Sequence, residues 1–295
     1  MITIKNEALT VQIATLGAEL QSIRSSEREY LWHGDAQYWN RRSPILFPFV
    51  GSVWNAEYCH AGKVYGMNQH GFARDMEFSV VRQSDSEVLM AVESTDETLL
   101  RYPFPFRLEI SYRLHERTLT VGWRVVNTGE EEMHFQIGAH PAFVWDNSDA
   151  VRRGSFVFDA EGPVAGTLLD QKGCIHAEPQ YFSQSLESGP HAGEGVLPLT
   201  HDYFDEMDTL VLEHDQVRSV LLRDNADQPI VGVRFAAPVV GIWTPTAKQA
   251  PFVCIEPWYG RCDRAHNTGE LAQHDWTNHL APGAEFVTEY HIDLY

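Results

Sequence analysis

The sequence is short of positive charge and of long apolar runs. Of its 295 residues, 22 are Lys or Arg and 41 are Asp or Glu, so the formal net charge is −19 and the pI is near 5.0. Nucleic-acid binding needs a basic surface, and a membrane span needs about 20 consecutive apolar residues, which the chain does not contain. The N-terminus also lacks a basic leader followed by an apolar core. We therefore expect a cytoplasmic protein that binds neither nucleic acid nor membrane.

Cysteines are also few. Cys59, Cys174, Cys254 and Cys262 lie far apart and form no C-x-x-C pair, which excludes a zinc ribbon and a dense disulfide framework. We expect them to be small, buried hydrophobic side chains. A composition with 43% apolar and 12% aromatic residues excludes a disordered chain, because it can bury enough surface to offset the loss of chain entropy.

Sequence motifs for metals, nucleotides and serine nucleophiles are missing. There is no H-E-x-x-H, no Asp-rich calcium loop, no G-x-S-x-G and no G-x-x-x-x-G-K. The pair Cys262-x-x-x-His266 is too small to indicate a metal site by itself. We therefore expect no metal and no cofactor.

Helical patterns are scarce, and alternation of apolar and polar residues is common. One short helix is predicted from Thr95 to about Tyr102, ended by Pro103. Period-two patterns predict strands. They occur at residues 2–4, 9–13, 108–114 and 119–125, and similar strand-like runs occur at 217–222, 229–235, 251–258 and 285–295. Because parallel strands usually need a helix in each crossover, this pattern favours an all-β fold, a large antiparallel β-sandwich.

The domain organisation leaves two possibilities. The Gly- and Ser-rich stretch from about Phe182 to Gly195 fits a linker between two domains, or a long loop of one sandwich, since strand-like spacing continues on both sides. We favour a single domain over residues 1–295.

Three titratable residues stand in confined surroundings. Glu256 follows the apolar run 252–255 and precedes a proline, so we place it at the end of a buried strand. It is a candidate general base with a raised pKa, or a strand-end glutamate that faces solvent or pairs with an arginine. His140, also followed by a proline, and His70 are candidates for proton transfer, or core histidines held by backbone groups. Four tryptophans are candidates for stacking on a sugar or for core packing: Trp32, Trp54, Trp145 and Trp258.

Taken together, several segments resemble the aldose 1-epimerase (mutarotase) superfamily, and more closely its lactose-operon-X-like branch. The resemblance covers nearly the whole chain and depends on the order of the segments. They are residues 16–23 (LGAELQSI), 30–32 (YLW), 44–51 (PILFPFVG), 70–74 (HGFAR), 102–106 (YPFPF), 138–143 (GAHPAF) and 255–260 (IEPWYG).

The resemblance implies a β-supersandwich and metal-independent interconversion of the α and β anomers of an aldose, and our leading hypothesis for this aldose is a free hexose. It implies that His140 acts as acid toward the ring oxygen, that Glu256 acts as base toward the anomeric hydroxyl, and that His70 helps to hold the sugar. Asp208 resembles the family's sugar-binding aspartate, with Asp205 as the competing candidate. A neutral sugar suits a concave site that has few charges and an aromatic wall, to which we assign Trp258.

One departure concerns the sugar. Relatives commonly carry an arginine after the Val-Gly of residues 50–51, and this chain has Ser52 there. Arg74, Arg42 or Arg41 is expected to substitute for it in substrate binding. These arginines also leave a hexose 6-phosphate open as the substrate.

Two further functions stay open on the sequence. One is a non-catalytic sugar-binding or sensor protein that keeps the pocket without turnover. The second is a glycosidase that uses Glu256 and Asp208 as its two carboxyl groups. The sequence also leaves the choice between monomer and homodimer open.

Overall fold

The structure is a computed structural model of the chain. It describes residues 1–145, 154–160, 163–167, 169, 173–175, 180–181, 184–185, 195–198, 204–205 and 208–295. Most of the stretch from residue 182 to 195, predicted as a linker or long loop, lies outside these described residues.

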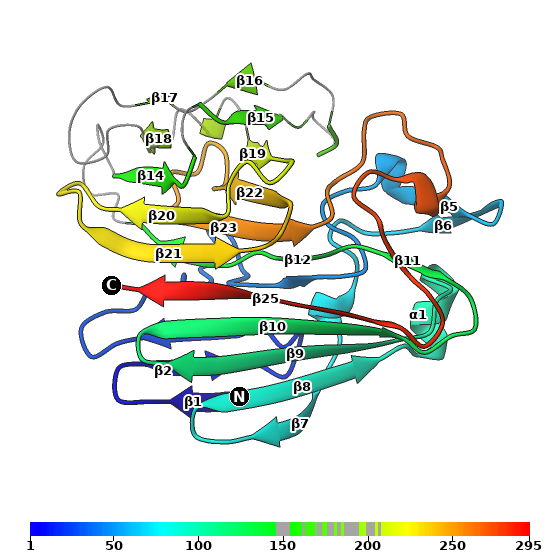
Figure 1. The fold of residues 1–295 in the computed structure, drawn as a ribbon, viewed down its shortest axis with the longest axis horizontal. Coiled ribbons are helices and arrows are strands. Elements are labelled where there is room, and N and C mark those ends of the chain that lie inside the picture. The colour runs from blue at the N-terminus through cyan, green and yellow to red at the C-terminus, as the bar shows by residue number, and fades with distance from the viewer. Residues whose placement is uncertain are drawn as a thin grey trace.

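The longest sheet of the described chain is antiparallel and has ten strands (Figure 1). Its long central strands β9 and β10 alternate buried and less buried side chains, which confirms the period-two prediction. From edge to edge the order is β17 (Gln184–Ser185), β18 (Gly195–Pro198), β14 (Ser155–Phe158), β20 (Ser219–Arg223), β21 (Pro229–Phe235), β25 (Glu285–Leu294), β10 (Thr118–Asn127), β9 (Phe106–His115), β8 (Glu87–Glu93) and β7 (Ser79–Gln83).

A second antiparallel sheet, with eight strands in the described part of the chain, carries the two strands that matter most for function. Its order is β16 (Gln180–Tyr181), β15 (Ala165–Thr167), β19 (Thr209–Leu212), β22 (Val239–Trp243), β23 (Phe252–Tyr259), β12 (Ile137–Ala139) and β4 (Ile45–Leu46), and β13 (Ala142–Val144) also pairs with β23. The all-β, antiparallel class predicted from the sequence is confirmed.

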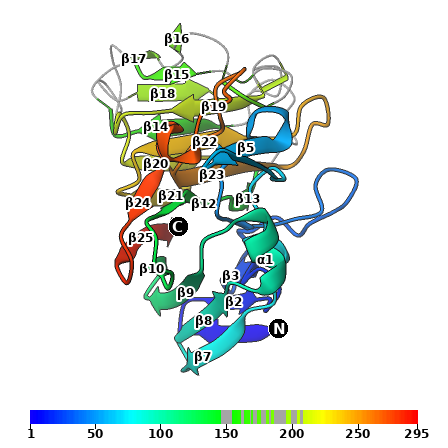
Figure 2. The same cartoon turned by 90° about the vertical axis from the view of Figure 1, so that its right-hand side faces the viewer.

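Smaller elements complete the described structure. They are the three-stranded sheet β1 (Ile2–Lys5), β2 (Thr10–Ile13) and β3 (Leu20–Arg24), the pair β5 (Glu57–His60) and β6 (Lys63–Gly66), the pair β11 (Met133–Phe135) and β24 (Asn278–Leu280), and the 3₁₀ turns η1 (Trp54–Ala56), η2 (Ala73–Asp75) and η3 (Leu271–Gln273). The predicted helix is α1 (Asp96–Arg101), which Figure 2 shows at the end of the long strands. It begins at a capping box formed by Thr95 and Thr98.

The main core lies between the two large sheets and also beneath β1 to β3. One continuous apolar cluster contains Val231 and Val233 of β21 together with Val253 and Ile255 of β23. Because side chains alternate along a strand, the intervening residues of β23 point to the opposite face of the eight-stranded sheet. Glu256 is one of these residues.

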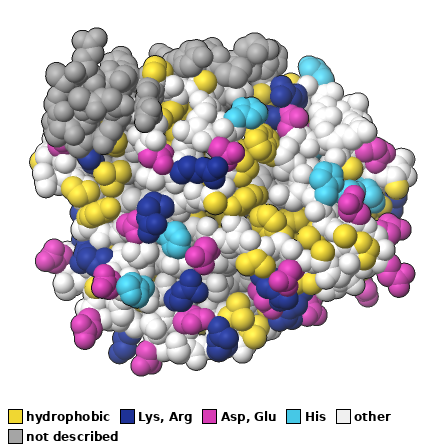
Figure 3. All heavy atoms as spheres, viewed as in Figure 1, with side chains coloured by type: hydrophobic (Ala, Val, Ile, Leu, Met, Phe, Trp, Pro, Cys, Tyr) yellow, Lys and Arg dark blue, Asp and Glu magenta, His cyan; other side chains and the backbone are white. Residues whose placement is uncertain are grey.

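The surface charges, the cysteines and the helices can be compared with the expectations from the sequence. On the face seen in Figure 3, acidic and basic side chains are interspersed. The cysteines form no disulfide within the described residues; three of them are buried as expected, whereas Cys59 is partly exposed. Within the described residues, no helix is long and apolar enough to cross a membrane.

Candidate active site

His140 and Glu256 lie side by side because of the register of three strands. On one flank of β23, Gly138 of β12 pairs with Trp258, and Ala142 of β13 pairs with Cys254. Both pairs belong to the same antiparallel register, so His140 falls directly opposite Glu256. The segment from β12 to β13 is therefore one strand that is interrupted at His140.

Two prolines explain the interruption. Pro141 follows His140 and Pro257 follows Glu256, and neither has an N–H to donate to the ladder. Glu256 was expected at a strand end, but β23 continues through Pro257 to Tyr259, because its other edge pairs with β22. Glu256 is therefore an interior strand residue, which fixes its position more firmly than the sequence indicated.

The two side chains are in direct contact, and their polar atoms lack other hydrogen-bond partners among the described residues. His140 Nε2 lies 3.4 Å from Glu256 Oε2, and the Glu256 side chain is only 1% exposed. Among the described residues, His140 Nδ1 and both carboxyl oxygens of Glu256 have no hydrogen-bond partner. A buried polar group without partners is costly, and such groups concentrate where a ligand completes the hydrogen bonding.

Burial pushes both groups toward their uncharged forms. It lowers the pKa of His140 to about 3, and the positive charges of Arg74 and Arg41 act in the same direction. Burial raises the pKa of Glu256 well above its usual value, the neighbouring Trp258 acts against the rise, and the nearby Asp208 adds to it. In both residues the shift favours the uncharged form of the side chain over the charged form.

His70 is held by a reciprocal backbone contact. Its N–H donates to the carbonyl of Gly51 at 2.8 Å, and the Gly51 N–H donates to His70 Nδ1 at 3.0 Å. Burial, followed by the charges of His140, Arg74 and Arg41, lowers the pKa of His70 well below its usual range. The neutral ring with Nδ1 as acceptor carries its proton on Nε2, which is free to donate. Its ring meets that of His140 edge to face, with centroids 5.4 Å apart.

A cavity of about 250 Å³ opens over these three residues. Its other lining residues are Trp39, Gly51, Gln69, Arg74, Leu169, Gly173, Asp208, Thr209, Trp243, Trp258 and Cys262. Three tryptophans and a small number of polar groups give it the character of a site for a neutral, hydroxyl-rich ligand.

Two of the tryptophans in this wall were not found from the sequence. Trp39 stacks on His140 with ring centroids 4.8 Å apart, and Trp243 meets the same imidazole edge to face at 5.3 Å. Trp39 lies in an irregular loop, so no period or motif could have identified it. Trp243 could be identified from strand alternation. It is the last residue of β22 and lies on the same face as Gly241, which pairs with Glu256.

Of the four tryptophans predicted as candidates from the sequence, Trp258 lines the cavity. Trp32 and Trp145 are fully buried, and Trp32 stacks on Phe252 with centroids 4.7 Å apart, as core residues do. Trp54 lies against His266 and is not part of this wall.

Of the two aspartate candidates, one lies in the cavity lining and the other lies outside it. Asp208 lines the cavity and accepts a hydrogen bond from Trp243 Nε1 at 3.2 Å. Burial raises the pKa of Asp208, although this hydrogen bond acts against the rise. Asp205 is exposed, and its carboxylate accepts a hydrogen bond from the Ala247 N–H, away from the cavity lining.

Of the three candidate arginines, one lies in the cavity lining. Arg74 is the one Lys or Arg among the described residues of the cavity wall, and its Nη2 donates to the Gln69 carbonyl at 2.7 Å. Arg41 pairs with Asp75 at 2.7 Å. Arg42 lies outside the lining and donates to Gln21 Oε1. Ser52 is likewise outside this lining.

Comparison with known proteins gives one consistent result. The family model described as Aldose 1-epimerase matches residues 1–292. The chromosomal and plasmid forms of Protein LacX from Lactococcus lactis subsp. lactis are 30% and 31% identical to this chain over 271 residues, which are 88% of this chain and 87% of each relative.

Solved structures agree. A galactose mutarotase related enzyme from Lactobacillus acidophilus has a TM-score of 0.90 and 31% identity, covering 100% of this chain and 97% of that one. A galactose mutarotase-like protein from Lactobacillus casei ATCC 334 has a TM-score of 0.91 and 30% identity, with 100% of both chains covered.

Proposed function

The chain belongs to the aldose 1-epimerase family, and from that premise we propose that it interconverts the α and β anomers of a free hexose by acid–base ring opening and closure. The observation that carries the proposal is the contact between His140 and Glu256 at 3.4 Å, at the floor of a cavity with aromatic walls. Both groups transfer protons, and both lack other hydrogen-bond partners among the described residues.

The close spacing of the two groups suits this reaction. His140 and Glu256 are adjacent in one wall of the cavity and do not face each other across it. Ring opening removes a proton from the anomeric hydroxyl and delivers one to the ring oxygen, and these two oxygens are bonded to the same carbon. An acid and a base that lie side by side can therefore reach both oxygens from one direction.

Each proton transfer in the proposed reaction has a donor and an acceptor. The pair works with one proton, which on His140 Nε2 makes that imidazole the acid and leaves Glu256 as the carboxylate base. Glu256 then takes the proton of the anomeric hydroxyl while His140 protonates the ring oxygen, and the ring opens to the aldehyde. Rotation about C1–C2 exposes the other face, and closure reverses both transfers. No proton is gained or lost overall, and each transfer contributes roughly 10²–10⁴-fold.

The remaining polar groups would position the sugar. His70 Nε2–H and the Arg74 guanidinium are donors toward the cavity, and the carboxyl of Asp208 is the opposing acceptor. Trp258 and Trp39 provide flat apolar faces for the C–H surface of the ring.

Freshly dissolved pure anomers, followed by NMR, test this function. We expect the protein to accelerate the loss of the pure anomer for at least one free hexose in a panel of aldoses and their 6-phosphates. Arg74 is the single cation among the described residues of the wall, which favours uncharged sugars over phosphates. Saturable saccharide binding without acceleration would contradict the proposal and indicate a non-catalytic sugar-binding protein. Acceleration of 6-phosphates alone would show that the substrate is a hexose 6-phosphate and not a free hexose.

A further inference from the structure

A second cluster of titratable side chains lies between two strands outside the cavity lining. In the pair β11 and β24, His134 is directly opposite His279, although the two are 145 residues apart in the sequence. Glu132 precedes His134 by two residues, so it projects to the same side of the strand. Three potential metal-ligand groups thus converge from two distant segments of the chain.

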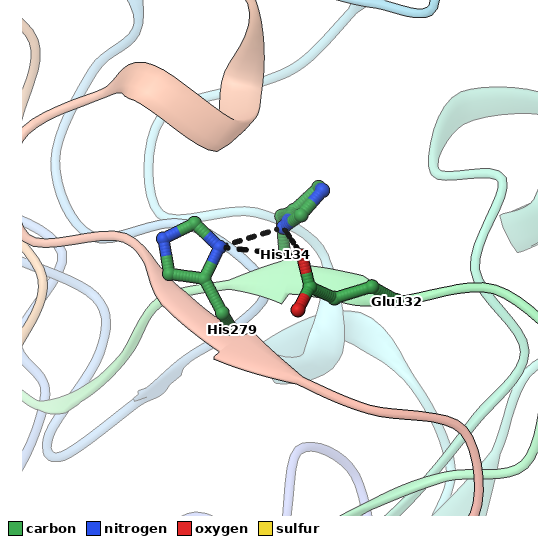
Figure 4. Close-up of side chains that lie close together, drawn as sticks. All are labelled: Glu132, His134 and His279. Atoms are coloured by element: carbon green, nitrogen blue, oxygen red, sulfur yellow. Dashed lines mark hydrogen bonds and ion pairs between the residues drawn. The ribbon is translucent and has the colours of Figure 1, made fainter.

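The donor atoms form a compact triangle (Figure 4). His134 Nδ1 lies 3.0 Å from His279 Nδ1, and Glu132 Oε2 lies 4.0 Å from the first and 3.9 Å from the second. The point equidistant from these three atoms is about 2.1 Å from each, which is the usual length of Zn–N and Zn–O bonds in proteins. All three atoms lie within 4.8 Å of one another, as a shared ion requires.

The surroundings hold the triangle in place and leave it accessible. The Tyr102 hydroxyl donates to the His134 carbonyl at 2.8 Å, and Asn278 Nδ2 donates to the carbonyls of Phe135 and Tyr259 at 3.0 and 2.9 Å. His134 is buried, whereas the side chains of Glu132 and His279 are about half exposed. An ion would therefore reach the site from solvent and retain room for a water ligand.

The chemistry of the three side chains also suits a cation. A neutral imidazole can place its proton on Nε2 and offer Nδ1 as a ligand. One carboxyl group and two imidazoles form a donor set that is typical of sites for divalent transition metals.

We propose that Glu132, His134 and His279 bind one divalent transition-metal ion of the Zn²⁺ class, which clasps β11 to β24. None of the three lines the cavity over His140 and Glu256, so the proposal is independent of the proposed function. It also differs from the sequence expectation of no metal, because the spacing along the chain has no recognisable metal motif.

Zinc titration of the full chain after chelator treatment tests the proposal. Calorimetry with ZnCl₂ is expected to give one equivalent bound, with an affinity that falls at least tenfold in Glu132→Gln and in His279→Ala. Glu132 is half exposed, so Glu132→Gln should keep the wild-type melting temperature without metal, whereas His279→Ala also removes the hydrogen bond to His134 and is compared with its own metal-free melting temperature. Zn²⁺ should raise the melting temperature of the wild type, and raise it less in the variants.

Two further variants separate this site from other histidines. His115→Ala removes an exposed imidazole elsewhere and should bind zinc like the wild type. Glu256→Gln removes a member of the other cluster in the described chain, His140, Cys254 and Glu256, and should also bind normally. The proposal is overturned by the absence of stoichiometric binding, by unchanged affinity in Glu132→Gln and His279→Ala, or by loss of binding in Glu256→Gln alone.

Discussion

At the scale of single residues, Glu256 is the buried carboxyl group of the candidate site that has no hydrogen-bond partner among the described residues. Its carboxyl is buried, lies beside a neutral imidazole, and accepts no hydrogen bond from the described residues. Such a group costs about 1–3 kcal/mol of stability when it has no partner. We infer that this cost is retained because the reaction needs a proton-transfer group of raised pKa at that position.

The first prediction concerns the stability of Glu256→Gln. Because burial raises the pKa of Glu256 in the folded state, the folded protein binds that proton more tightly than the unfolded chain. The contribution of Glu256 to stability therefore declines as the pH rises above about 4.5, the unfolded value. Glu256→Gln should be more stable than the wild type at pH 8, by about 1 kcal/mol, and gain less at pH 5.

Urea unfolding at pH 5 and pH 8 measures this difference. Glu57→Gln, at an exposed position, is the control and should follow the wild type at both pH values. If the stabilities of the wild type and of Glu256→Gln differ by the same amount at both pH values, the pKa of Glu256 is not raised in the folded state.

Sequence reasoning identifies individual residues where local context restricts them. The prolines that follow His140 and Glu256 single out these two residues, and His70 belongs to a recognisable segment. Arg42 is predicted as a possible substitute for the arginine that relatives carry in place of Ser52, but it lies outside the cavity lining, since its neighbours in space are set by a loop. Trp39 escapes prediction for the same physical reason: a loop residue has no periodicity from which its direction can be predicted.

At the scale of elements, β23 determines the site. Its inner face supplies Val253 and Ile255 to the main core, and its outer face supplies Glu256 and Trp258 to the cavity. The apolar run in the sequence predicts a strand here. Its register against the interrupted strand β12 and β13, which brings His140 to Glu256, depends on a pairing between distant segments and could not be read from local pattern.

The second prediction concerns Gly241 of β22. A Cβ at this position would lie 2.4 Å from Trp258 Cη2 and Cζ2, so the indole must move. Gly241→Ala should therefore lower kcat/KM for mutarotation at least tenfold, because Trp258 forms a wall of the cavity. Gly232→Ala in β21 is the matched control, since its nearest atoms are 3.6 Å away. Equal activity in the two variants would argue against a role of the Trp258 wall.

The third prediction concerns the loop between β23 and β24. His274 Nδ1 lies 2.8 Å from Asp263 Oδ1, and both side chains are buried. Burial lowers the pKa of His274, but the hydrogen bond and charge of Asp263 outweigh it and raise the pKa above 6.5. The contact should stabilise the protein fully below about pH 6.5 and lose that effect as the pH rises through the folded pKa.

His274→Gln tests this contact by thermal unfolding. We expect a destabilisation of about 2 kcal/mol at pH 6, the range of a hydrogen bond between charged groups, and a smaller one at pH 9. Equal destabilisation at the two pH values would show that packing, rather than the protonated imidazole, accounts for the effect.

At the scale of the whole molecule, one apolar cluster joins the chain from end to end. It includes Ile2 of β1 and Leu294 of β25, together with the inner faces of both large sheets. We propose on this basis that residues 1–295 form a single domain. The antiparallel class was predictable from alternation, whereas the strand orders depend on contacts between residues far apart in sequence, for which one sequence carries no signal.

Calorimetry gives the fourth prediction. A single domain should unfold in one cooperative transition, with a calorimetric enthalpy equal to the van't Hoff enthalpy. Two separable transitions would instead support two domains linked by the stretch around residues 182–195.

The most direct test of the proposed function is the rate of anomer interconversion in His140→Asn and Glu256→Gln, followed by polarimetry on whichever hexose the wild type accelerates. We predict a fall of at least about 10²-fold in kcat for each variant, with folding intact and the sugar still bound. Wild-type rates in both variants would contradict the proposal, because the two adjacent side chains would then have no part in moving the proton.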